Sequence, residues 1–376
     1  MPQLAVPDAE VILESRKYKY SRARELLLDA ILAGEFAADS VLPAEAVLCR
    51  QLGIGRNTLR AALHELEDAG VIIKQHGRCS RINFEALRQK RTPLRRIAWL
   101  DTSPIANTNQ IYFDIFRAVS EETAARGVRL DYISLSISAM AENFFERQLD
   151  YHGLILGEIT PGFESYLGEI THPNSICVDC PRKGIAHCVK TDNYLGGRLA
   201  ARTLVRSGHR RPALLGFDRT ICEYLPFEER CRGFADELAE SGVPLPPERI
   251  LMLSADDKAH FPAFLEANLG RLNECDALFV IADMFAVEAL YALPKLGLRI
   301  PGRLSLIGFD GLTLSRFVSP ALTTIRQPVR EIGRKALEIV LNPAESYAYP
   351  GSIPIPPTLI PGGTVRMTVP PERPIR

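Results

Sequence analysis

Three polar side chains at the start of one segment have the chemistry needed to read DNA bases. Arg56, Asn57 and Arg60 surround the apolar Leu59, and a helix beginning here would place them at its N-terminal end and on its outer face. Arginine can donate two hydrogen bonds to guanine, and asparagine can pair in the same way with adenine. Thr58 and the free backbone donors of the first turn could hold a phosphate. We therefore expect Arg56, Asn57, Thr58 and Arg60 to contact nucleic acid.

A short turn with basic and imidazole side chains follows this segment. Residues 71–74 and 79–82 are apolar enough for two strands, and Gly77 between them permits the positive φ of a tight hairpin turn. His76, Gly77 and Arg78 would then lie at the tip of a wing that can enter the minor groove. These three residues complete the predicted DNA contacts.

The elements that position these side chains are three helices and the hairpin. Apolar residues recur at helical spacing over 22–33, 43–52 and 56–70. From Ser15 to Arg95 there are 15 Lys or Arg and 9 Asp or Glu residues, a difference of +6, although the whole chain has 45 of each. The sequence therefore predicts a winged helix-turn-helix domain over residues 15–83, at the basic end of the chain.

The remainder of the chain has the pattern of a larger α/β protein. Polar, Pro-interrupted residues 84–95 are typical of a linker. Short apolar runs then alternate with helical segments, at residues 97–100, 153–156, 176–178, 212–216, 277–281 and 304–309. This alternation is typical of parallel sheets covered by helices. We expect a multidomain α/β chain whose large domain covers residues 96–370.

The first domain resembles the GntR family. The matching residues are Leu42-Pro43-Ala44-Glu45, Leu48, Leu52-Gly53-Ile54, the run Arg56 to Arg60, Ala62-Leu63, Leu66, Gly70 and His76-Gly77. The resemblance covers about residues 18–82 and implies binding to a double-stranded DNA operator. The chain departs from the family in having Gly55 in place of a Ser or Thr cap and Ala46 in place of a frequent Arg, so its affinity or operator sequence should differ from those of typical members.

The second domain resembles the effector domain of LacI-type regulators. The matching segments follow the family's order: Asp192-Asn193 with Gly196-Gly197, Arg230 to Phe234, Asp276 to Phe279, Gly297 to Pro301, Ser305 to Asp310 and Pro320 to Pro328. The resemblance implies two α/β lobes with a ligand between them and a homodimer formed through the lobes. The combined chain resembles the arabinose-repressor arrangement, which makes a pentose or another plant-derived sugar the expected effector.

The resemblance also names the residues expected to contact the effector. Arg230 and Asp310 match positions that contact ligand in the family, and Asp283 falls in a segment where the family often has an Asn-Asp pair. By analogy of position, the other lobe should contribute Asp101, Asn109, Tyr112 and Phe113. Planar charged groups with an aromatic face nearby suit vicinal hydroxyls. Arg230 could instead pair with Glu228 or Glu229, and Tyr112 or Phe113 could belong to the core.

Eight cysteines leave one further possibility open. Cys177 and Cys180 form a C-x-x-C pair with Cys188 nearby, a pattern that can indicate zinc or redox chemistry. No second C-x-x-C completes a four-ligand set, so packing cysteines are the favoured interpretation. We expect no metal, no cofactor and no structural disulfide.

The sequence predicts a transcriptional regulator, and a repressor controlled by a sugar is the favoured form. A composition of 46% hydrophobic and 24% charged residues excludes a disordered or fibrous chain. No apolar window is long enough for a membrane helix and no signal peptide is visible, so we expect a cytoplasmic location. No catalytic motif was found. The alternatives are a sugar-active α/β enzyme with a basic module, a nucleobase effector, and activation in place of repression.

Overall fold

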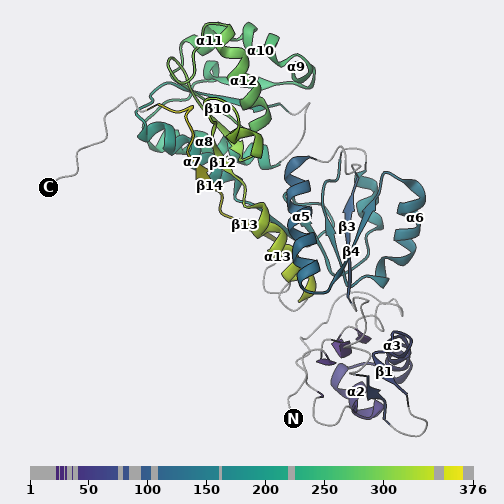
Figure 1. Ribbon diagram of the computed structural model, residues 1–376. Helices are drawn as coiled ribbons and strands as arrows, with labels where there is room; N and C mark the ends of the chain where they lie inside the picture. The colour runs from purple at the N-terminus through teal and green to yellow at the C-terminus, as the bar shows by residue number, and fades with distance from the viewer. Residues whose placement is uncertain are drawn as a thin grey trace, which may run out of the picture. The chain divides into compact units, whose positions relative to one another are not determined.

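The computed structural model describes residues 23–24, 26–28, 30–31, 36, 41–74, 79–83, 95–102, 109–160, 163–218, 225–342 and 351–366. The chain divides into two compact units (Figure 1). One comprises Met1–Asn107, Val119–Ile176 and Leu337–Pro350, and the other Thr108–Ala118, Cys177–Ala336 and Gly351–Arg376. Within the described ranges, no helix has the length and apolar character needed to cross a membrane.

The N-terminal part contains the predicted helices and hairpin. Its elements are α2 (Glu45–Leu52), α3 (Arg56–Asp68), β1 (Ile72–Ile73) and β2 (Arg81–Ile82), preceded by helical residues between 23 and 31. Strands β1 and β2 pair antiparallel, which confirms the predicted hairpin. Leu48, Leu59, Leu63 and Leu66 pack together in one core and so fix the outward face of α3. The wing tip, residues 75–78, and residues 84–94 of the expected linker lie outside the described residues.

A six-stranded sheet has the order β13-β7-β6-β5-β3-β4. Its strands are β3 (Arg96–Asp101), β4 (Arg129–Ser134), β5 (Gly153–Leu156), β6 (Ser175–Val178), β7 (His187–Thr191) and β13 (Gly351–Ile355). β3 runs parallel to β4 and to β5, and β7 runs parallel to β13. The associated helices are α5 (Gln110–Ala125), α6 (Ser138–Arg147), α13 (Val329–Leu341), η2 (Gln148–Asp150) and η3 (Glu164–Glu169).

A second six-stranded sheet has the order β14-β12-β11-β10-β8-β9. Its strands are β8 (Pro212–Phe217), β9 (Ile250–Leu253), β10 (Ala277–Val280), β11 (Ser305–Asp310), β12 (Thr323–Arg326) and β14 (Thr358–Ile360). Only the pairing of β12 with β14 is antiparallel among the pairings described for this sheet. Around it lie α7 (Asn193–Arg206), α8 (Leu225–Glu240), α9 (Ala255–Ala259), α10 (Phe261–Ala267), α11 (Leu269–Asn273), α12 (Asp283–Lys295), η4 (Pro247–Arg249) and η5 (Thr313–Arg316).

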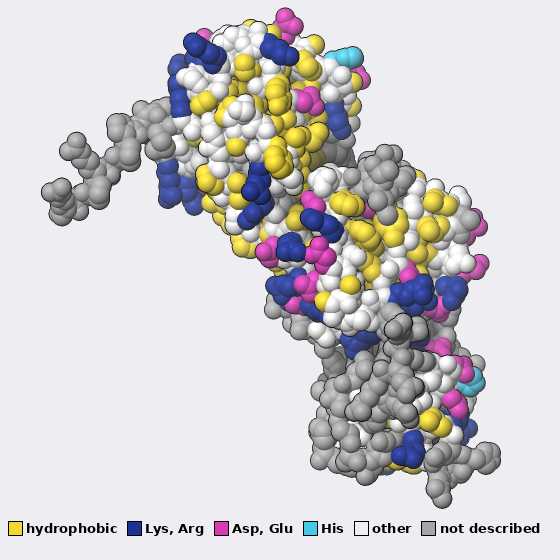
Figure 2. All heavy atoms as spheres, in the orientation of Figure 1, with side chains coloured by type: hydrophobic (Ala, Val, Ile, Leu, Met, Phe, Trp, Pro, Cys, Tyr) yellow, Lys and Arg dark blue, Asp and Glu magenta, His cyan; other side chains and the backbone are white. Residues whose placement is uncertain are grey.

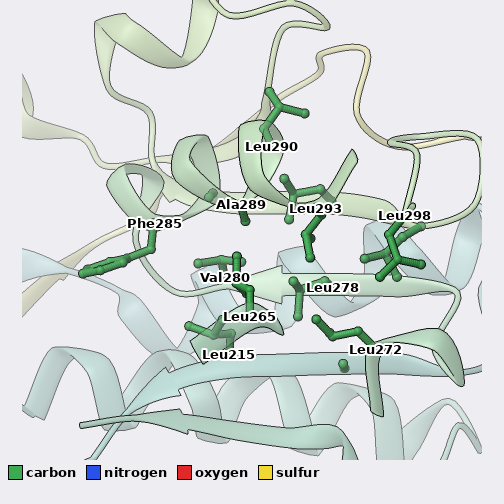
Figure 3. Packing of buried hydrophobic residues seen from close by; sticks show 14 of the residues in the cluster. Leu215, Leu265, Leu272, Leu278, Val280, Phe285, Ala289, Leu290, Leu293 and Leu298 are labelled. Carbon is green, nitrogen blue, oxygen red and sulfur yellow. The ribbon is translucent and has the colours of Figure 1, made fainter. Parts of the chain in front are cut away.

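The six apolar runs in the sequence all form strands, because their side chains are buried by helices on the sheet faces. Figure 3 shows this packing where Ala289 and Leu293 of α12 face Leu278 and Val280 of β10. Burial of such side chains contributes about 1.5–3 kcal/mol each. This core fixes α12 and the end of β11, where Asp283 and Asp310 lie.

Two glycines bring α7 and α8 into close contact. A Cβ added to Gly197 would lie 2.1 Å from the carbonyl oxygen of Arg230, and one added to Gly233 would lie 2.0 Å from the carbonyl oxygen of Tyr194. Only a glycine allows backbone to approach this closely. The contact sets the position of the α8 turn that carries Arg230.

Candidate ligand site and nucleic-acid interface

The guanidinium of Arg230 is the centre of a buried polar cluster in the second unit. Arg230 is 2% exposed. Its Nε donates to Asn193 Oδ1 at 2.8 Å, and its Nη1 donates to the carbonyl oxygen of Ile281 at 2.6 Å and to Asp310 Oδ1 at 3.1 Å. The guanidinium carbon also lies 3.8 Å from the ring centroid of Phe309. The possible pairing of Arg230 with Glu229 does not form, since Glu229 binds Lys190 instead.

Asp310 is held at the end of β11 by several partners. Its Oδ1 also accepts from Gln327 Nε2 at 2.9 Å, and Gln327 in turn accepts from Thr191 Oγ1 at 2.6 Å. Its backbone has φ 123°, a conformation that non-glycine residues rarely adopt. Burial raises the pKa of Asp310, and the positive charge of Arg230 partly opposes that rise. Such backbone strain at a buried charged group is common in functional sites.

Asp283 supports the loop after Asp310. Its Oδ2 accepts from the backbone N–H groups of Gly311 at 2.9 Å and Leu312 at 3.0 Å and from Ser315 Oγ at 2.7 Å. Its Oδ1 accepts from Thr324 Oγ1 at 2.7 Å, and its side chain is fully buried. With these oxygens already bound, Asp283 lies behind the cluster rather than at its surface. Burial, followed by the charge of Asp310, raises the pKa of Asp283 to about 7.

Asp179 is a member of the cluster that the sequence analysis missed. It directly follows β6, is 5% exposed and has φ 66°. Tyr112 hydrogen-bonds to its carboxylate, and Arg230 and Asp310 lie close enough to shift its pKa in opposite directions. Burial is the largest effect and raises the pKa of Asp179. Its Oδ1 is buried without a hydrogen-bond partner, which is costly and points to a missing donor.

The structure therefore joins some of the expected effector residues and separates others. Arg230, Asp283, Asp310 and, through Asp179, Tyr112 meet in the second unit. Asp101 belongs to the first unit, is buried at the end of β3 and accepts from Trp99 Nε1 at 3.3 Å. Asn109 is exposed and accepts from the backbone N–H of Ile111 at 3.0 Å, and Phe113 is 37% exposed.

The predicted base-reading side chains lie on the open face of α3. Arg56, Asn57 and Arg60 are exposed and Thr58 is half-buried, whereas Leu59 is fully buried. Arg60 Nε donates to Glu45 Oε2 of α2 at 3.0 Å, so part of its guanidinium is already oriented. Gly55 gives α3 no side-chain cap, which leaves its first backbone donors open for an anion. The wing residues His76, Gly77 and Arg78 lie outside the described residues.

Two family models match the chain in these two regions. Residues 19–82 match bacterial regulatory proteins of the gntR family, and residues 201–365 match the periplasmic binding protein-like domain. The chain therefore combines a match to the gntR family with a match to the periplasmic binding protein-like domain. This confirms the resemblance recognised in the sequence, because the matched ranges contain α3 in the first case and Arg230, Asp283 and Asp310 in the second.

Relatives that match over most or about half of their length agree with this domain composition. The chain is 28% identical over 354 residues to the arabinose metabolism transcriptional repressor of Geobacillus stearothermophilus, covering 87% of this chain and 91% of that protein. It is 34% identical over 185 residues to the transcriptional regulator GalR of Salmonella typhimurium, covering 49% of this chain and 51% of that protein. The match to GalR thus spans about half of that relative's length.

Solved structures show the same fold at lower identity. The complex of the transcriptional regulator CelR with cellobiose superposes with a TM-score of 0.60 and 18% identity, covering 86% of this chain and all of that one. A LacI family regulator from Mycobacterium smegmatis gives a TM-score of 0.58 and 23% identity, covering 72% of this chain and 99% of that one. The multidomain α/β fold predicted from the sequence is therefore confirmed.

The raised pKa of Asp283 predicts a stability that depends on pH. Because the folded pKa of about 7 lies above the unfolded value of about 4, the group's stabilising contribution is complete below pH 4 and is lost as the pH rises to about 7. Replacing the neighbouring carboxylate in Asp310→Asn lowers the pKa of Asp283, so this loss ends at a lower pH. Denaturant unfolding at closely spaced pH values between 4 and 8 measures both profiles. Coincident profiles would show that the charge of Asp310 does not reach Asp283.

Proposed function

We propose that the protein is a transcriptional repressor whose affinity for double-stranded DNA is controlled by a sugar bound at the Arg230 cluster. The observation that carries this proposal is the unpaired Asp179 Oδ1 beside a buried guanidinium, in a chain that also has a gntR-family module. The chain acts where the chromosome lies, in the cytoplasm. The named relatives are regulators, which supports a binding function over catalysis.

The polar groups of the cluster suit a hydroxyl-rich ligand. The Asp179 carboxylate needs a donor, while Arg230 uses Nε and Nη1 for its three hydrogen bonds and so keeps the N–H groups of Nη2 for a ligand. A hydroxyl group of a ligand can donate to the Asp179 carboxylate and accept from Nη2 of Arg230. Since Asp310 already neutralises Arg230, an uncharged sugar fits the cluster better than a sugar phosphate. We keep Asn109, Tyr112 and Phe113, which belong to the same unit as Arg230, as proposed contacts of the same ligand.

Control of DNA binding requires a ligand with different affinities for two arrangements of the protein. A sugar that favours one arrangement weakens DNA binding if DNA favours the other, and the coupling is reciprocal. Asp310 is suited to transmit the ligand's presence, because its carboxylate also accepts from the backbone N–H of Asp283 at 3.3 Å. Asp283 in turn holds the loop of Gly311 and Leu312. We assign Asp283 this supporting role.

Ligand binding is tested by thermal unfolding with L-arabinose, D-ribose and cellobiose, their phosphates, and purine bases. A binding ligand raises the unfolding temperature by mass action, and we expect an uncharged sugar to do so. Asp179→Asn removes the unpaired carboxylate and should weaken binding by about 10- to 100-fold, or about 1.5–3 kcal/mol. Asp256→Asn, at an exposed carboxylate of α9, is the control. A purine as the sole ligand would replace the sugar assignment, and equal affinity of the Asp179→Asn protein would remove Asp179 from the site.

DNA recognition by α3 is tested with a duplex selected from a randomised pool. Arg56→Ala should weaken specific binding by about 1–3 kcal/mol, because it removes a side chain able to pair with a guanine edge. Arg126→Ala removes an exposed arginine directly after α5 and should leave binding unchanged. Fluorescence anisotropy at fixed salt measures both variants. Unchanged selectivity in Arg56→Ala would mean that α3 does not read the bases through this residue.

We further propose that the protein forms a homodimer through the surface of β4 and α6. A groove of about 490 Å³ lies there, lined by Ile133, Phe144, Tyr151 and other side chains. On its border Ile137 and Met140 are 55% and 37% exposed, and Figure 2 shows hydrophobic side chains gathered over this region. An apolar projection beside an apolar groove on one surface suits a two-fold interface, in which each copy fills the groove of the other. At the edge of the groove, Arg147 supplies a positive charge and Asp150 a negative charge.

The dimer is tested by sedimentation velocity. Ile137→Glu places a charge on the apolar projection and should raise the dissociation constant of the dimer at least tenfold. Met252→Glu, at a residue of β9 that is 42% exposed, is the matched control. A wild-type protein that sediments as a monomer at micromolar concentration, or an Ile137→Glu protein as dimeric as the wild type, would reject this interface.

A further inference from the structure

Two buried thiols lie side by side on neighbouring strands next to the ligand cluster. Cys177 is on β6 and Cys188 on β7, and these strands are adjacent in the sheet. Cys177 Sγ lies 3.3 Å from the carbonyl oxygen of His187, the residue before Cys188, and the two thiols hydrogen-bond to each other. The thiol of Cys180 is directed instead to the carbonyl oxygen of Pro181, at 3.7 Å. The structure therefore pairs Cys177 with Cys188 rather than with the second cysteine of the C-x-x-C motif.

The geometry of adjacent strands allows a bond between these thiols. Neighbouring strands lie about 4.8 Å apart, which is within the separation of about 4.4–6.8 Å that the Cα atoms of a disulfide require. The two side chains are 1% and 2% exposed, so a bulky disulfide reagent cannot reach them in the folded state. A hydroperoxide of nearly the size of water is the class of oxidant that fits.

The two thiols differ in reactivity. The hydrogen bond from Cys188 is the largest effect on Cys177 and lowers the pKa of its thiol, and the charge of Arg182 acts in the same direction. The same hydrogen bond raises the pKa of Cys188. Because the thiolate is the nucleophile, Cys177 is the thiol that an oxidant would meet first.

Both strands lead directly into the ligand cluster. Asp179 follows Cys177 by two residues, and Thr191, which binds Gln327, follows Cys188 by three. A bond between the strands fixes their spacing at the point where the carboxylate of Asp179 is positioned. Oxidation of the thiols would therefore change the positions of the ligand-binding residues.

We propose that Cys177 and Cys188 form a reversible disulfide that adjusts the ligand cluster in response to hydroperoxide. The thiolate of Cys177 attacks the O–O bond, which forms a sulfenic acid and releases the other oxygen as water after protonation. Cys188 then attacks the sulfenic sulfur, the S–S bond forms, and the hydroxyl group leaves as a second water with the proton of Cys188. Two thiols are oxidised and one peroxide is reduced, and a dithiol reverses the reaction. The regulatory meaning of this step rests on the proposed function.

The bond is tested by peptide mapping of the full chain after treatment with hydrogen peroxide. Tryptic cleavage places Cys177 and Cys180 together in residues 148–182 and Cys188 in residues 184–190. In a Cys180→Ser background we expect these peptides to be cross-linked without reductant and separate after dithiothreitol. Cys188→Ser should abolish the link. Absence of the link in the Cys180→Ser protein, or a link that persists in Cys188→Ser, would overturn the proposal.

The effect on the cluster is read without any ligand, so it does not depend on whether a sugar binds. Hydrogen exchange of residues 175–191 should differ at least threefold in rate between the peroxide-treated and reduced Cys180→Ser proteins, with no change in Cys188→Ser treated in the same way. If the disulfide forms without altering hydrogen exchange in these residues, the proposal that it adjusts the ligand cluster is refuted. Failure of every sugar to bind would instead reject the proposed function and leave the disulfide intact.

Discussion

The need to satisfy one buried positive charge organises the second unit. A guanidinium removed from water costs several kcal/mol unless it is paired and hydrogen-bonded. Arg230 meets this need with a side-chain amide from α7, a backbone carbonyl after β10 and a carboxylate at the end of β11, while an aromatic ring lies against its plane. Removing one partner of such a pair typically costs about 3–5 kcal/mol. The close approach of α7 and α8 at Gly197 and Gly233 is what allows one side chain to reach all of these groups.

The local pattern of the sequence was sufficient to predict secondary-structure elements and the exposed face of α3. Leu59, Leu63 and Leu66 recur at helical spacing, which determines that Arg56, Asn57 and Arg60 point outward once those leucines are buried. The strands with continuous apolar runs were equally predictable. Strand β4 was not, because Arg129 and Asp131 interrupt its pattern, and only the sheet shows that they form an ion pair at 2.7 Å. Strand β9, by contrast, is an apolar run of four residues, Ile250–Leu253, although its Met252 is exposed.

The polar cluster was only partly predictable, since it depends on contacts between distant parts of the chain. Arg230 and Asp310 are 80 residues apart, and Tyr112 reaches the cluster from α5. Asp179 had a usable signal: like Asp310, it is an acidic residue that directly follows a buried apolar run. The neighbouring Cys177 and Cys180 form a C-x-x-C pair, which the sequence analysis interpreted as packing residues. The actual neighbour of Cys177 lies on the next strand, which spacing along the sequence does not reveal.

The positive φ angles of Asp179 and Asp310 bear on how this protein could be redesigned as a sensor for a new compound. At 66° and 123° these backbones are poorly tolerated by β-branched or bulky residues, and only glycine and, for Asp179, asparagine adopt them readily. Most members of a library that randomises both positions would therefore be destabilised, by about 1–3 kcal/mol at each strained position. Diversity introduced at Tyr112, on the regular backbone of α5, leaves the strained positions intact and changes the shape of the cluster instead.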